Sequence, residues 1–202
     1  MAFGKVIDDS PYEVKDKISL GTYFKRRRIE WIATKNITNL NPIFYQMKSN
    51  QHALSSVNRY ASFIDREIGN LYKKGDKTHY VLNIDKKENI NFDELRSLMD
   101  NINILMKEIN KELNFDDDLD KFYIKINLQS KGTIELIKAG KSLAVLAYLL
   151  SLVSCNDVNK NNDSKIQGLL DKNKTVLEQT AQDIETLEVN THELTKPFKN
   201  GN

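Results

Sequence analysis

The uncharged run within residues 140–157, GKSLAVLAYLLSLVSCND, limits the fold more than any other feature of the chain. Residues 143–153 carry no charge, and Ser151 alone interrupts the apolar side chains. A membrane-spanning helix needs about 20 mainly apolar residues, whereas a run of roughly 10–14 is typical of a buried core helix. Extension toward the N-terminus meets Glu135, which a membrane interior tolerates poorly. We therefore expect a core helix first, an oligomer interface second and membrane insertion by 134–155 third.

Apolar side chains surround this helix, so a single sheet face would leave some of them exposed. A second cover is needed, and either the weakly amphipathic segment 165–189 or a second copy of the chain fits that role. The candidate interface residues on the two segments are Leu143, Leu146, Tyr148, Leu150, Ile166, Leu169, Val176 and Leu187. The sequence leaves open whether 165–189 docks on its own domain or pairs with a partner.

Hydrophobic periodicity predicts an α+β fold, in which a small sheet of about 3–4 strands from residues 28–130 is packed by three long helices. The expected strands are 43–48, 79–85 and 121–130, and the expected helices are 50–74, 92–113 and 133–155. The order strand, helix, strand, helix from 79 to 155 predicts a crossover unit with helices on one face. The apolar spacing of 21–35 fits a helix or a strand equally well.

The segment KFYIKINLQS, residues 121–130, alternates between apolar and polar side chains. Such alternation is typical of a strand with one buried face. We expect the buried side chains to be Phe122, Ile124, Ile126 and Leu128, and the outward side chains to be Tyr123, Lys125 and Asn127.

Composition changes abruptly after Cys155, where the chain reads NDVNKNNDSK. This change predicts a core domain followed by a linker and a helical C-terminal appendage. The expected division is an N-terminal arm over 1–20, an α+β core domain over 21–155, a polar linker over 156–164, an amphipathic helix over 165–189 and a flexible tail over 190–202.

The near balance of basic and acidic residues excludes a strong electrostatic field of one sign over the whole protein. The net charge is +2, from 30 basic and 28 acidic residues, so no general attraction to nucleic acid or anionic membranes follows. The single cysteine excludes an internal disulfide. The first residues, MAFGKVIDDSPYEVKD, hold acids where a signal peptide needs an apolar stretch. We expect a cytoplasmic protein, or one within a viral particle.

The basic run at residues 25–28, KRRR, is the strongest local concentration of charge. Arginine and lysine grip phosphates, and neighbouring aromatic rings stack on bases. The same run also fits a solvated edge whose arginines pair with acids such as Asp8. The candidate nucleic-acid contacts are Tyr23, Lys25, Arg26, Arg27, Arg28 and Trp31.

Other chemical motifs are incomplete. The acidic residues 116–120 begin like a calcium loop but lack its glycine and closing glutamate, so we expect a solvated turn. Residues 140–142, GKS, copy the end of a phosphate-binding loop without its upstream glycine. The histidines His52, His79 and His192 lack zinc-ligand spacing, and we expect them to be isolated at the surface or at edges.

These observations favour a non-catalytic function. We expect an interaction or assembly protein, a component of a larger bacterial or viral complex, with a protein partner or a homo-oligomeric state. The first alternative is a nucleic-acid-binding module that uses residues 25–28. The second is a membrane-active protein that uses 134–155. We name no catalytic residue, no cofactor and no metal ligand.

Overall fold

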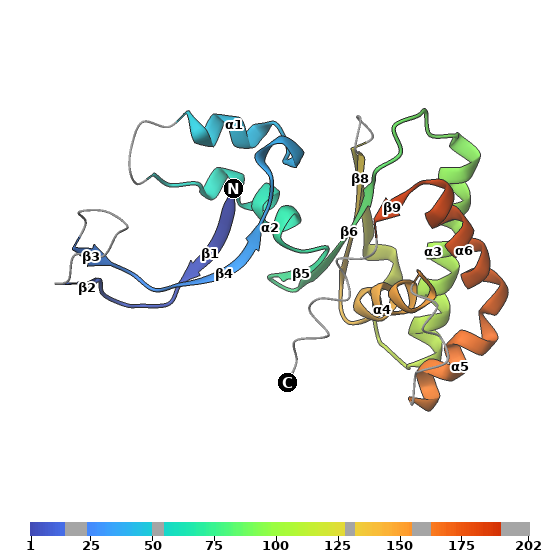
Figure 1. Cartoon of the computed structure of the whole chain (residues 1–202). Coiled ribbons are helices and arrows are strands. Elements are labelled where there is room, and N and C mark those ends of the chain that lie inside the picture. Colours follow the sequence, from blue (N-terminus) through green and yellow to red (C-terminus); the bar gives the residue numbers. More distant parts are fainter. Residues whose placement is uncertain (15–23, 50–54, 128–131, 155–162, 191–202) are drawn as a thin grey trace. The chain divides into compact units, whose positions relative to one another are not determined.

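The computed structural model describes residues 1–14, 24–49, 55–127, 132–154 and 163–190. The chain divides into two compact units, Met1–Ile68 and Gly69–Asn202. Both units combine helices with antiparallel strands, so the α+β class is confirmed. Figure 1 shows the elements of both along the chain, and the expected arm, core domain, linker and appendage stay a prediction.

Unit 1 contains two short antiparallel strand pairs and small helices. Its elements are β1 (Ala2–Val6), β2 (Tyr12–Glu13), β3 (Lys25–Arg26), β4 (Ile29–Thr34), the 3-10 turns η1 (Ile37–Asn39) and η2 (Asn58–Tyr60), α1 (Ile43–Lys48) and α2 (Ala61–Ile68). β1 pairs with β4, and β2 pairs with β3. Residues 25–34 are therefore mainly strand, which answers the question that their spacing left open. The buried centre of unit 1 contains Phe3, Leu40 and Phe44.

Two predictions in unit 1 are wrong. Residues 43–48 were expected to form a strand because isoleucine, phenylalanine and tyrosine favour strands, but they form α1. Asn41 Oδ1 accepts a hydrogen bond from the Ile43 amide at 3.0 Å, which satisfies a donor at the helix start. The long helix predicted over 50–74 is shorter in its described part, because α2 ends at Ile68 and a strand begins at Leu71.

Unit 2 is built on a five-stranded antiparallel sheet. Four of its strands follow the order β5-β6-β8-β7, and the fifth, β9, pairs with β6. The strands are β5 (Leu71–Lys74), β6 (Lys77–Ile84), β7 (Phe122–Asn127), β8 (Gly132–Ala139) and β9 (Val189–Asn190). β6 corresponds to the strand predicted over 79–85. Gly75, with φ 63°, and Asp76 form the turn of the β5–β6 hairpin, where a helix end had been expected.

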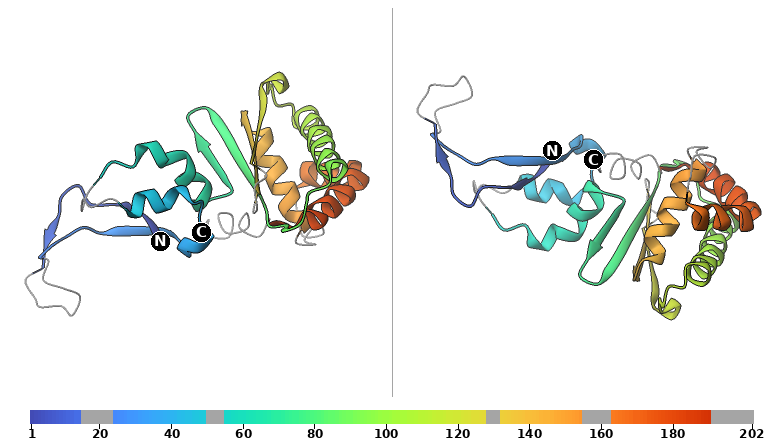
Figure 2. Two further views of the ribbon diagram at one scale, coloured as in Figure 1. Left: turned by 90° about the horizontal axis from the view of Figure 1, so that it is seen from above. Right: turned by 90° about the horizontal axis from the view of Figure 1, so that it is seen from below.

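The helices of unit 2 are α3 (Phe92–Glu112), α4 (Ser142–Ser154), α5 (Ser164–Lys172) and α6 (Lys174–Thr186), with the 3-10 turn η3 (Leu119–Lys121) before β7. Figures 1 and 2 show α3, α4 and α6 on one side of the sheet. Helix α3 connects β6 to β7, which run parallel with β8 between them, so the crossover skips one strand. The helix predicted over 92–113 is α3, and the Asn91 side chain caps it through the Asp93 amide at 2.8 Å.

The helix predicted over 133–155 is wrong in its first half, which is strand β8. Gly140, with φ 94°, separates β8 from α4. A Cβ atom at this position would collide with the Asp117 carboxylate, whose Oδ2 accepts from the Ser142 amide at 3.0 Å. Residues 140–142 therefore form a helix start. Glycine is needed at 140 because the φ angle is positive and because the Asp117 carboxylate leaves no room for a Cβ atom.

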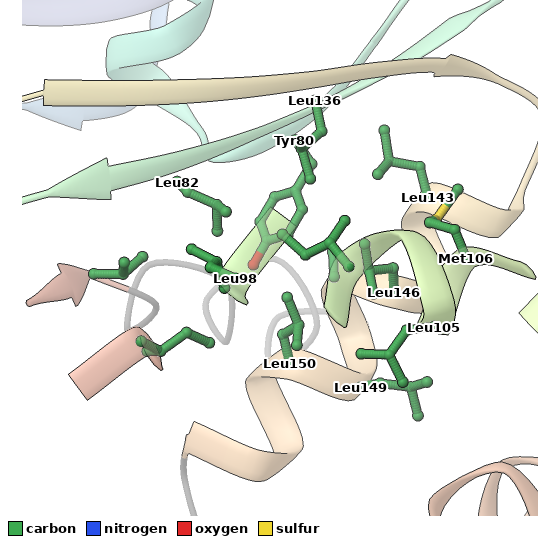
Figure 3. Close-up of a cluster of buried hydrophobic side chains, with 14 of the residues drawn as sticks. Tyr80, Leu82, Leu98, Leu105, Met106, Leu136, Leu143, Leu146, Leu149 and Leu150 are labelled. Carbon is green, nitrogen blue, oxygen red and sulfur yellow. The ribbon is translucent and has the colours of Figure 1, made fainter. Parts of the chain in front are cut away.

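Helix α4 lies in the core of unit 2, as its length predicted. Figure 3 shows Leu143, Leu146, Leu149 and Leu150 facing side chains from α3 and the sheet. Helices α5 and α6 supply the second cover, because Leu169, Leu177 and Ile184 belong to the same buried cluster. Asp183 on α6 accepts from Ser97 and Asn101 of α3, each at 2.9 Å. The segment 165–189 thus docks on its own unit.

Candidate interaction surfaces

The β1–β4 pair of unit 1 exposes large apolar side chains on both of its faces. Trp31 is 63% exposed and Ile32 is 53% exposed. Successive side chains of a strand point to opposite faces, so these two residues lie on different sides of the pair. Val6 and Ile29 are exposed as well and stand opposite each other in the register. We call Val6, Ile29, Trp31 and Ile32 the ribbon surface.

Gly4 shapes this surface. It stands opposite Trp31 in the β1–β4 register, and a Cβ atom there would lie 3.1 Å from Trp31 Cε3 and 2.9 Å from the Glu30 carbonyl oxygen. Real Cβ atoms rarely approach backbone so closely. The missing side chain lets the indole ring lie against β1 while most of its surface faces solvent, which is the geometry of an aromatic anchor.

The basic run 25–28 lies beside the ribbon surface in the chain. Lys25 and Arg26 form β3, opposite Glu13 and Tyr12 of β2. Arg27 Nη1 donates to the Asp8 backbone carbonyl at 2.9 Å, so it contacts the acid's main chain and not its carboxylate.

The rest of the predicted nucleic-acid set is only partly described. The guanidinium carbon of Arg28 lies 6.0 Å from the centroid of the Tyr12 ring. Phe24 is exposed and stands directly before the basic run, as an aromatic neighbour of its cations. Tyr23 lies outside the described residues. The structure thus places an exposed aromatic side chain on each side of the run, at Phe24 and Trp31.

A buried polar cluster lies on the sheet face opposite the helices of unit 2. Glu135 on β8 is 2% exposed, and its Oε1 accepts from the Tyr72 hydroxyl at 2.8 Å and lies 2.8 Å from His79 Nδ1. The Tyr72 and His79 rings stack with centroids 4.8 Å apart. Lys125 Nζ on β7 lies 3.9 Å from Glu135 Oε2. His79, expected to be isolated, is instead buried and paired.

The chemistry of this cluster fits a structural role best. A carboxylate accepts hydrogen bonds, so the pair with Glu135 places a proton on His79 Nδ1 and fixes the orientation of the ring. That arrangement would also suit a general base. However, His79 is 9% exposed and Glu135 less, so neither offers much surface to a substrate. The described residues contain no group of three or more side chains able to hold a metal ion.

Strand β7 is exposed along almost its whole length, contrary to the prediction of one buried face. Ile124 and Ile126 are 41% and 51% exposed, and Tyr123 is half exposed. Phe122 is partly buried, and Leu128 lies outside the described residues. The isoleucines share a sheet face with the buried Leu136 and Ile134, their partners in the β7–β8 register. We call Tyr123, Ile124 and Ile126 the β7 surface.

The acidic segment 116–120 is tied into the fold more closely than a solvated turn. Asp117 caps α4, and the Asp118 carbonyl accepts from the buried Lys138 Nζ at 2.8 Å. The hydrogen bond from Lys121 holds the pKa of the Asp118 carboxyl below its usual value, and the same contact raises the pKa of Lys121. The segment joins η3 to the start of α4.

The candidate interface residues on α4, α5 and α6 belong mostly to the core. The fully buried ones are Leu143, Leu146, Leu150, Leu169 and Leu187, and the partly buried ones are Tyr148, Ile166 and Val176. They pack within their own unit, and the large apolar side chains that are exposed lie elsewhere, many of them on strands. Among the described residues, none of the helices has the length and apolar character that crossing a membrane requires.

Part of the polar cluster was accessible to sequence reasoning. A two-residue turn at Gly75 and Asp76 places Tyr72 opposite His79, so the hairpin signal alone would have paired these rings. Glu135 joins them from a strand that sequence reasoning assigned to a helix. Comparisons with known protein families, with curated proteins and with solved structures found no match to this chain.

Proposed function

We propose that this chain is a non-catalytic interaction or assembly protein, a component of a larger bacterial or viral complex, that binds protein partners through exposed strands. The observation that supports the proposal best is the exposure of Val6, Ile29 and Trp31, which the register places on one face of the β1–β4 pair. Large apolar side chains gathered on a monomer's surface mark interaction sites when they form a contiguous patch.

The ribbon surface has the composition of an interface centre. Tryptophan is enriched among the residues that dominate binding energy, and one aromatic side chain buries about 150–250 Å². At roughly 25 cal/mol per Å², covering the indole of Trp31 contributes several kcal/mol of transfer free energy, before the costs of association are subtracted. Lys5 and Glu30, opposite each other in the register, lie on the same face as Ile32 and give that face polar neighbours.

The decisive experiment uses the full chain as bait and compares two matched variants. We expect the wild-type chain to retain a partner in fixed stoichiometry, and Trp31→Ser/Ile32→Ser to weaken that binding by at least about 30-fold, as hot-spot truncations do. Phe92→Ser is the control, because Phe92 is 73% exposed at the start of α3, outside both defined surfaces. Circular dichroism checks that each variant is folded.

Trp31 provides an independent signal because it is the only tryptophan in the chain. We expect its emission to resemble that of tryptophan in water and to shift to shorter wavelength when the purified partner is added. The proposal is contradicted if the wild-type chain binds no protein and the fluorescence of Trp31 stays fully open to quenching from solvent. Equal loss of binding in Phe92→Ser and in the ribbon variant contradicts it too.

A nucleic-acid-binding module is the second candidate, favoured by the exposed aromatic residues Phe24 and Trp31 on either side of the basic run 25–28. Its test is fluorescence anisotropy with labelled single- and double-stranded oligonucleotides at two salt concentrations. Binding that falls steeply with salt and is reduced by Lys25→Ala/Arg26→Ala/Arg28→Ala would support it. The matched control is Lys73→Ala/Lys74→Ala, which removes exposed cations from β5.

A further inference from the structure

Strand β7 ends the sheet of unit 2. It pairs with β8 on one side, and its other edge has no strand partner among the described residues. In an antiparallel pair, alternate residues direct their amide and carbonyl groups away from the neighbouring strand. These groups form a template on which a further strand can add, and five of the six residues of β7 are exposed.

Natural sheets protect such edges with prolines, bulges or charges. The sequence of β7, FYIKIN, contains no proline, its register with β8 has no irregularity, and its only charge is Lys125. That lysine leans toward Glu135 at 3.9 Å. A strand that pairs with β7 therefore has to accept a cation at one position and large apolar side chains at the others.

A second copy of β7 meets these requirements, and the registers centred on Ile124 and on Lys125 pair the most residues of the strand, five of the six. A strand can pair with its own copy around a two-fold axis. In such an antiparallel pair, two opposite residues must either both point their amide and carbonyl groups toward the other strand or both point them away. The register must therefore be centred on a residue. Centring on Lys125 places two lysines opposite each other, and centring on Tyr123 places Lys125 opposite Lys121, so both registers set like charges together.

Centring on Ile124 removes this conflict. Tyr123 then stands opposite Lys125 of the second copy, twice per dimer, and an ammonium group over an aromatic ring is favourable. The Tyr123 ring already takes such a contact, since Lys77 Nζ lies 5.3 Å from its centroid. On the other sheet face Ile124 meets its own copy and Phe122 meets Ile126, which extends the apolar rows of Leu136 and Ile134.

We propose that two copies of the chain pair through β7, antiparallel and centred on Ile124, to form one continuous sheet across the dimer. This inference deepens the proposed interaction function and rests on it, because it names a second copy as one partner. Two six-residue strands bury less than the ~1,000 Å² typical of a stable interface. We therefore expect a dimer that forms with rising concentration and is not obligate.

The first test is sedimentation equilibrium of the full chain over a wide concentration range, starting from the 23.3 kDa monomer. Tyr123→Glu places an acid opposite Lys125 of the second copy and should tighten the dimer about three- to tenfold, whereas Tyr123→Lys should weaken it by a similar factor. The opposite signs are expected wherever Tyr123 stands opposite a lysine, as it does in the register centred on Ile124. Centring on Tyr123 itself would make both variants weaker.

The second test uses cysteines in a Cys155→Ser background, which has no other cysteine. In the proposed register Ile124→Cys faces its own copy with Cα atoms about 4.5–5.5 Å apart, within reach of a disulfide. Ile126→Cys is the matched control on the same sheet face. In this register residue 126 stands opposite residue 122 of the second copy, so the two introduced cysteines are four residues, or roughly 13 Å, apart along the strand. That distance is too long for a disulfide. We expect mild oxidation to cross-link the first variant alone.

Three outcomes overturn the inference. A monomer at every concentration excludes the dimer, a dimer insensitive to both Tyr123 variants uses another surface, and preferential cross-linking of Ile126→Cys shows a different register. These failures remain distinguishable from failure of the proposed function. Partner binding through the ribbon surface is measured separately with the Trp31 variants, whose side chains belong to the other unit.

Discussion

Strands β7 and β8 are neighbours in one sheet, and both are rich in isoleucine and in residues that favour strands, yet their environments are opposite. β8 is buried along almost its whole length, including Glu135 and Lys138, whereas β7 is exposed from Tyr123 to Asn127. β8 has a strand on each side, and its apolar face joins the cluster formed with the helices. Position in the sheet, and not composition, separates the two strands.

The largest expected effect comes from the same truncation on both strands. Leu136 on β8 is fully buried, so Leu136→Ala should lower the free energy of unfolding by about 2–5 kcal/mol through lost transfer energy and a cavity. Ile124, its register partner on β7, is 41% exposed, so Ile124→Ala should cost less than about 1.5 kcal/mol. Urea denaturation followed by far-ultraviolet circular dichroism measures both. Equal losses would refute the comparison.

The charges of the two strands should differ in the same way. Glu135→Ala removes the acceptor of Tyr72 and His79, and leaving buried donors unpaired should cost about 2–3 kcal/mol. Lys125→Ala removes an exposed cation and should change stability by less than about 1 kcal/mol.

Glu135→Gln is the control for the buried position, because it keeps an oxygen acceptor in place and should lose less than the alanine variant. A double-mutant cycle with His79→Ala isolates the coupling between the two side chains. Additive losses in that cycle would show that the 2.8 Å contact contributes little to the fold.

A smaller effect of opposite sign is expected across the β6–β8 pair. Tyr80 on β6 stands opposite Leu136, and its hydroxyl is fully buried among the side chains of Figure 3 without a hydrogen-bond partner within the described chain. Burial raises the pKa of this phenol well above its ordinary value of 10. Tyr80→Phe removes an unsatisfied polar group and should stabilise unit 2 by about 1 kcal/mol. A destabilised variant would show that the hydroxyl is satisfied.

The contrast between β7 and β8 also explains what the sequence predicted well and what it did not. The helix over 92–113 was accessible because its apolar stripe and its Asn91 cap are local signals. The alternation of β7 correctly indicated a strand. The sequence could not predict that its isoleucines are exposed, since their exposure depends on which elements cover that edge of the sheet.

The errors at 43–48 and 133–139 have related physical causes. Strand-favouring residues formed α1 because Asn41 and Pro42 begin a helix there, a start signal that outweighs residue preference. In β8 the buried Glu135 and Lys138 disturb the alternation, so the segment read as the start of the following helix. The break between them depends on the positive φ of Gly140, which a sequence does not display.

The smallest expected effect concerns an exposed ion pair, at the opposite extreme from buried Glu135. Lys172 Nζ on α5 lies 2.6 Å from Glu112 Oε1 at the end of α3. The hydrogen bond from Lys172 holds the pKa of the Glu112 carboxyl below its ordinary value of 4.5. A lowered pKa in the folded state means that the pair stabilises unit 2 at pH values above 4.5, and that this contribution disappears as pH falls through the folded pKa.

Lys172→Met should therefore reduce the stability of the chain near neutral pH and have no effect at acid pH, where Glu112 is protonated in both proteins. Added salt should shrink the difference, because both side chains are partly exposed. Lys121→Met is the local comparison: it breaks the Asp118 pair, which lies within one turn of chain, and because Lys121 likewise lowers the pKa of Asp118, its loss should follow the same pH dependence. Urea denaturation across the pH range measures both variants. If the loss in Lys172→Met persisted below the folded pKa, the lysine would stabilise α5 by packing and not by charge.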